Sequence, residues 1–126
     1  MLASRSLLFG LAALTLSGSA AWSQSTCSVP GFRLIPGQTA EGIMTVKAGK
    51  TCSIAFFGSG FPGGVTDTRI VKNPAQGTAN VSSTSVRYVP KAGYVGRDEF
   101  VYAREGLDMV GRKTTATAKV TVTVIP

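Results

Sequence analysis

Carboxylates are the side chains of this sequence best suited to binding a metal ion, and the chain has 6 of them. Asp98 and Glu99 are adjacent, and Glu105 and Asp108 follow closely. Calcium takes about six to eight oxygen ligands, usually from several carboxylates around one loop. Alternation along a strand would direct Asp98 and Glu99 to opposite faces, away from a shared ion. We therefore expect no metal site, with calcium near Asp98 as the open alternative, and we expect Asp98 to brace the turn at residues 94–96.

The residue types also restrict catalysis. The chain contains no histidine, which excludes a Ser-His-Asp triad, a Cys-His dyad and a histidine-ligated zinc ion within it, and two cysteines cannot form a four-cysteine zinc site. Residues 57–61 (FGSGF) are superficially similar to a nucleophile elbow, but no histidine exists to activate Ser59. The scattered acidic residues do not suggest the facing carboxylates of a glycosidase. We expect no catalytic residue, no cofactor and no enzymatic activity.

Glycines at positions 58, 60, 63 and 64 make residues 56–64 the most unusual stretch of the chain. One interpretation is a ligand-contacting loop at the end of a β-sandwich, with Phe57, Ser59 and Phe61 as its contacts. The alternative is a glycine-rich connection whose phenylalanines fold back over the end of a sheet.

Basic side chains outnumber acidic ones, 13 to 6, which gives a formal net charge of +7. A charge of this sign favours attraction to an anionic polysaccharide, to lipid headgroups or to a nucleic acid. The alternative is a solvated, solubilising surface. The candidate basic contacts are spread along the sequence: Lys47, Arg69, Arg87, Arg97, Arg112 and Lys113.

Residues 1–23 have the features of a signal peptide. Arg5 provides positive charge, residues 6–18 form an apolar stretch too short to span a bilayer comfortably, and small residues follow at the spacing of a cleavage site. We expect export to the periplasm or the extracellular space, with no membrane span after cleavage. In such an oxidising compartment, Cys27 and Cys52 are expected to form a disulfide that contributes about 3–4 kcal/mol on the chain-entropy model.

Residues 24–126 are expected to form a single domain in which apolar and polar residues alternate with a period of two. The clearest case is residues 114–124, where alanine and valine alternate with threonine and lysine. Turn residues separate seven or eight short strands. This pattern predicts an all-β, antiparallel β-sandwich, with an open barrel as the alternative. The predicted core consists of Met44, Val46, Ile54, Phe56, Val86, Tyr88, Phe100, Tyr102, Val120, Val122 and Val124.

Residues 70–124 resemble a known family. The segments NPAQGTANV (73–81), VRYVPKAGYVGRDEF (86–100) and AKVTVTV (118–124) are similar to bacterial immunoglobulin-like or cadherin-like domains, which occur in tandem in large surface proteins. The resemblance implies an immunoglobulin-like sandwich used in adhesion or scaffolding rather than catalysis. The acidic calcium-binding linkers of many cadherin-like repeats are absent from this chain. The family's Pro-x-x-Gly, Tyr-x-Pro and Gly-x-Asp-x-Phe-x-Tyr motifs match Pro74 and Gly77, Tyr88 and Pro90, and Gly96, Asp98, Phe100 and Tyr102.

The sequence therefore favours a small exported immunoglobulin-like domain that binds a protein partner or serves as a scaffold, and it favours a monomer over a homo-oligomer. An electrostatic binder of anionic polymers is the alternative. One hypothesis places the final strand, residues 114–124, near a sheet edge, where unpaired N–H and C=O groups accept a strand from a partner or a second copy. In the other interpretation, this strand is paired on both sides.

Overall fold

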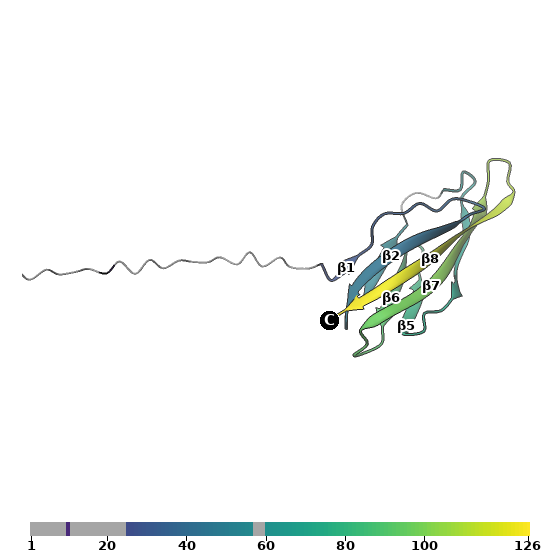
Figure 1. The fold of residues 1–126 in the computed structure, drawn as a ribbon. Coiled ribbons are helices and arrows are strands. Elements are labelled where there is room, and N and C mark those ends of the chain that lie inside the picture. The colour runs from purple at the N-terminus through teal and green to yellow at the C-terminus, as the bar shows by residue number, and fades with distance from the viewer. Residues whose placement is uncertain (1–9, 11–24, 57–59) are drawn as a thin grey trace, which may run out of the picture.

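The structure is a computed structural model that describes residues 10, 25–56 and 60–126. These residues form eight strands and no helix (Figure 1). The expected signal peptide, residues 1–23, lies outside the described residues apart from position 10. Across the described ranges, no helix has the length and apolar character that a membrane span requires. The strands are β1 (Cys27–Ser28), β2 (Thr39–Lys47), β3 (Cys52–Ala55), β4 (Val65–Lys72), β5 (Gly77–Val81), β6 (Ser85–Pro90), β7 (Gly96–Leu107) and β8 (Lys113–Ile125).

The strands form two sheets that face each other across the core, so the predicted all-β sandwich is confirmed (Figure 1). One sheet has the order β1-β2-β8-β7-β4, and the other has the order β3-β6-β5. Neighbouring strands are antiparallel except β2 and β8, which run parallel. This pair differs from the purely antiparallel arrangement that we expected. A tight turn joins only antiparallel neighbours, and here the whole chain between β2 and β8 makes the connection.

Of the two interpretations of residues 114–124, the strand paired on both sides is confirmed, and the sheet-edge hypothesis is wrong. β8 is the middle strand of its sheet and is paired with β7 on one side and with β2 on the other. The register with β2 places Met44 beside Val122 and Val46 beside Val124. All four side chains are buried, so adding β2 at this position extends the apolar inner face of the sheet.

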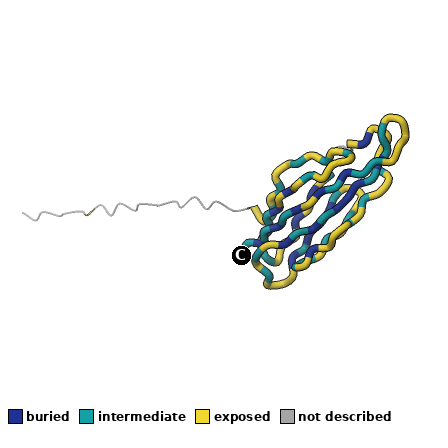
Figure 2. Tube along the Cα trace, turned by 45° about the vertical axis from the view of Figure 1, so that its right-hand side comes forward, coloured by how far each residue is buried: buried dark blue, intermediate teal, exposed yellow. Residues whose placement is uncertain are grey.

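The inner faces of the two sheets supply the core, which follows the alternation read from the sequence (Figure 2). Tyr88 on β6 and Phe100 on β7 stack with their ring centroids 5.8 Å apart, and they join the two sheets. Phe56 is half-buried and packs against this cluster from the end of β3. Ten of the predicted core residues are buried: Met44, Val46, Ile54, Val86, Tyr88, Phe100, Tyr102, Val120, Val122 and Val124.

Asp98 braces a different turn from the one we predicted. Its carboxylate oxygens accept hydrogen bonds from the backbone N–H groups of Ala75 at 3.0 Å and Gln76 at 2.9 Å. They also accept one from the Tyr88 hydroxyl at 2.7 Å and one from the backbone N–H of Glu99 at 2.9 Å. Asp98 points inward from β7, so it meets the turn that leads into β5 rather than the turn at residues 94–96.

The same turn requires a glycine at position 77. A Cβ atom there would lie 2.4 Å from the carbonyl oxygen of Val89 and 2.9 Å from the ring of Tyr88. Pro74, Gly77, Tyr88 and Asp98 therefore meet at one end of the sandwich. The motif residues that carry the family resemblance hold a turn against the second sheet, so their role is structural.

Candidate functional site

A groove of about 830 Å³ lies between residues 29–36 and the edge of β3. Residues 29–36 form one wall, and residues 53–56 form the other. Tyr102 and Arg104 enter from the inner face of β7 and form the floor. The groove walls carry mainly apolar side chains, and Ile35 is 42% exposed. A cavity of this size is in the range that binds a ligand or a short peptide segment.

The first wall leaves the sheet because of Pro30. Ser28 pairs with Thr45, and the same register continued by two residues would place Pro30 opposite Ile43. The ladder would need an N–H donor at that position. Proline has none, so the pairing stops. Within the described residues, the backbone of residues 29–34 makes no hydrogen bond to another backbone group.

The second wall is an open strand edge. β3 pairs with β6 only. The N–H of Phe56 donates to the carbonyl of Thr84 at 2.9 Å, and this bond fixes the alternation of the ladder. Cys52, Ile54 and Phe56 therefore direct their backbone groups toward β6. Those of Ser53 and Ala55 point to the opposite side, into the groove, and the described residues provide them with no backbone partner.

A disulfide closes one end of the groove. Cys27 bonds to Cys52, as predicted, with their Cα atoms 5.1 Å apart. Cys27 precedes the first wall, and Cys52 precedes the second. The bond therefore fastens the two walls together at that end.

Arg104 is the most unusual side chain of the groove. It is only 7% exposed, and its guanidinium carbon lies 3.9 Å from the centre of the Phe56 ring. Its Nε donates to Thr68 Oγ1 at 3.3 Å. None of the ion pairs between described residues includes Arg104. Buried arginines are normally paired with an acid, and the described residues provide Arg104 with no such partner.

Burial shifts the pKa values of both side chains at the floor of the groove, Tyr102 and Arg104. Desolvation lowers the pKa of Arg104, although the guanidinium stays protonated at any physiological pH. Burial also raises the pKa of Tyr102 to about 12, and the nearby positive charge of Arg104 opposes that rise. Tyr102 is therefore neutral and does not neutralise Arg104. A guanidinium in this state is suited to a charge-assisted hydrogen bond with a carboxylate.

The predicted binding loop is only partly described. Phe57 and Ser59 lie outside the described residues. Phe61 is 1% exposed, and its ring packs over Gly106, where a Cβ atom would lie 2.4 Å from a ring carbon. Phe61 therefore contributes to the core in this structure rather than to an exposed contact surface.

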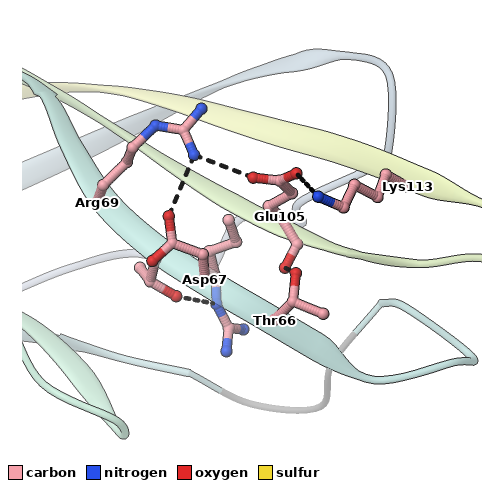
Figure 3. A network of polar contacts seen from close by, with 7 residues as sticks. Thr66, Asp67, Arg69, Glu105 and Lys113 are labelled. Carbon is pink, nitrogen blue, oxygen red and sulfur yellow. Dashed lines mark hydrogen bonds and ion pairs between the residues drawn. The ribbon is translucent and has the colours of Figure 1, made fainter.

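The predicted basic contacts lie apart from one another. Arg69 on β4 forms ion pairs with Asp67 at 3.2 Å and Glu105 at 3.3 Å, and Lys113 on β8 reaches Glu105 at 3.9 Å (Figure 3). In Figure 3 the Thr66 hydroxyl also donates to the backbone oxygen of Glu105.

The remaining basic candidates occupy several elements. Arg87 is exposed on β6, in the other sheet. Lys47 ends β2, Arg97 is near the start of β7, and Arg112 lies in the turn before β8, where its backbone N–H donates to Asp108. The structure therefore brings only Arg69 and Lys113 together, around Glu105.

Sequence reasoning missed Arg104 as a site residue, although a signal for it exists. Phe100 and Tyr102 were assigned to the inner face of their strand. The same alternation extended by two residues places Arg104 on that face. A charged residue in register with a core stripe is an inward-pointing residue that needs an explanation.

Comparison with known proteins gives one match. A family model described as a bacterial Ig domain matches residues 35–123, well over half of the chain. No curated protein and no solved structure matches the chain.

Proposed function

Because this chain belongs to the bacterial Ig domain family, we propose that it serves as a non-catalytic protein-binding module of the periplasm or cell surface. Immunoglobulin-like sandwiches present loops and strand edges on a rigid scaffold, and they serve many binding roles. The Cys27–Cys52 disulfide supports an extracytoplasmic location, because such bonds persist in oxidising compartments. The signal-peptide features of residues 1–23 support the same location.

The open edge of β3 beside the groove is the observation that carries this proposal. An unpaired strand edge is a template for strand addition, in which main-chain hydrogen bonds give affinity and side-chain pockets give specificity. Here the unpaired backbone groups of Ser53 and Ala55 adjoin a largely apolar groove. We therefore assign the binding role to the β3 edge and not to the final strand, which is paired on both sides.

Binding of anionic polymers is the second candidate, and the net charge of +7 favours it. The separation of the basic residues weakens it, because Arg69 and Lys113 are already neutralised by acidic neighbours. Salt distinguishes the two functions. Affinity for a polyanion falls steeply with ionic strength, whereas affinity through a mainly apolar groove changes little.

Site-specific photo-crosslinking tests the protein-binding function. A benzophenone amino acid replaces Ser53 on the open edge in one variant and Thr121 in the middle of the opposite sheet in the control. We expect irradiation of envelope fractions to give one discrete protein adduct from the Ser53 variant and none from the Thr121 variant. Equal adducts from both positions, or none from either, would contradict a binding role for the β3 edge.

A further inference from the structure

We propose that the groove binds an extended segment of a partner protein that pairs with β3 and places an aspartate or glutamate side chain on Arg104. This inference rests on the proposed binding function and adds the chemistry of the ligand. It combines two observations made on different elements, the unpaired backbone groups of β3 and the buried cation of β7.

The charge of Arg104 is the first part of the argument. A guanidinium has five N–H donors, and in the described residues a side chain accepts from only one of them, at Thr68. Its face is covered by Phe56. Asp98 points inward from the same strand, but its carboxylate accepts hydrogen bonds from four donors. Arg104 lines the groove, and no described side-chain nitrogen is buried without a hydrogen-bond partner, so its free N–H groups face the solvent of the groove. An entering carboxylate would replace that water as acceptor and supply the missing charge.

The geometry of strand addition specifies where that carboxylate must come from. Residues directly opposite each other in a ladder point to the same face of the sheet. A ligand residue opposite Ile54 would therefore point inward into the groove, where an apolar side chain fits beside Phe32 and Leu34. The next inward-pointing ligand residue, two positions along the ligand and opposite Phe56, would point to Arg104. The ligand pattern is one apolar and one acidic residue, separated by one residue.

Length and surroundings agree with a short segment inside a longer chain. β3 has 4 residues and is roughly 13 Å long at the usual rise of a strand. The side chains that point inward lie over the floor of the groove, which favours a side-chain carboxylate over the carboxylate at a chain terminus. The groove also presents half-buried Phe32 and Leu34 from its first wall, and these residues suit apolar ligand side chains.

Binding of defined peptides to the disulfide-bonded protein tests this inference. The probes are fluorescein-labelled heptapeptide amides of alternating valine and threonine, with glutamate placed at each position in turn, and matched peptides with glutamine. A third probe has no acidic residue and ends in a free carboxylate. Fluorescence anisotropy is measured with the natural protein, with Arg104→Gln, and with Arg87→Gln as a control on the exposed face of β6.

We expect the best glutamate peptide to bind about tenfold more tightly than its glutamine counterpart, the gain of one charge-assisted hydrogen bond. The preference should disappear in Arg104→Gln and persist in Arg87→Gln. On the natural protein, binding should slow amide exchange at Ser53 and Ala55.

Equal binding of both peptides, with Ser53 and Ala55 protected, would overturn the acidic ligand and leave the proposed function intact. Tighter binding of the peptide that ends in a free carboxylate would overturn the inference that an aspartate or glutamate side chain supplies the carboxylate. Absence of binding to every peptide would overturn the inference, while the crosslinking experiment separately decides the proposed function.

Discussion

The Tyr88 hydroxyl on β6 donates a 2.7 Å hydrogen bond to the Asp98 carboxylate on β7, which links the two sheets at a buried polar contact. Burial and this bond to a negative charge both raise the pKa of Tyr88, so its hydroxyl remains a donor at all physiological pH values. The contact holds the turn before β5 at the end of the sandwich opposite to Arg104 on β7.

Replacing Asp98 should destabilise the fold more than replacing its partner. Asp98→Asn keeps one acceptor oxygen but places an NH₂ group against backbone donors, and we expect a loss of about 2–4 kcal/mol in the free energy of unfolding. Tyr88→Phe removes one donor and should cost about 1–2 kcal/mol. Urea unfolding measures both values. A smaller loss for Asp98→Asn than for Tyr88→Phe would show that the carboxylate does not organise the turn.

Glu99 should titrate below its ordinary range. A hydrogen bond from Lys72 at 3.0 Å lowers the pKa of Glu99, and the charge of Lys119 adds to the effect. A lowered folded pKa gives a contribution to stability that is present above the unfolded pKa and is lost as the pH falls through the folded pKa. A carbon-detected NMR titration should show the pKa of Glu99 rising in Lys72→Met and rising less in Lys119→Met. The reverse order would contradict the assignment of Lys72 as the main partner.

Removal of the disulfide should loosen the groove as well as the fold. The bond closes a loop with a sequence separation of 25, and the double variant Cys27→Ser with Cys52→Ser should lose about 3–4 kcal/mol on the chain-entropy model. Residues 29–34 lack backbone pairing, so they should become the first site of limited proteolysis. Unchanged proteolysis at these residues would mean that the apolar contacts of Phe32 and Leu34 hold the wall without the bond.

A single methyl group at position 77 should be costly. In Gly77→Ala the new Cβ meets the backbone oxygen of Val89 at 2.4 Å, and this atom has no freedom to rotate away. We expect a loss of about 1–3 kcal/mol, as for overpacking elsewhere. Gly31→Ala is the matched control, because no atom lies within 4 Å of its new methyl group and it should leave stability nearly unchanged. Equal thermal midpoints of the two variants would refute the close approach at Gly77.

The core was predictable because a strand encodes burial locally. A period of two placed Val120, Val122 and Val124 on one face, and the structure buries all three. The position of β8 in its sheet was not predictable in this way. Strand order depends on pairing between residues far apart in the sequence, such as Met44 with Val122, and local alternation contains no information about it.

The site was harder to predict than the core. Ser53 and Ala55 look like ordinary exposed strand residues, and their backbone groups are open because β3 pairs with β6 alone. Local alternation contains no information about that strand order. Arg104 is not among the basic contacts predicted from the sequence. Its inward direction followed from the alternation of Phe100 and Tyr102, but a charged residue is normally expected at the surface.

Residue-resolved amide hydrogen exchange in the free protein is the measurement that tests the open edge most directly. The N–H groups of Ile54 and Phe56 point toward β6, and those of Ser53 and Ala55 point into the groove. We predict slow exchange at Ile54 and Phe56 and fast exchange at Ser53 and Ala55. Protection of Ser53 and Ala55 equal to that of Ile54 would mean that the edge is already covered, and it would contradict β3 as a binding edge.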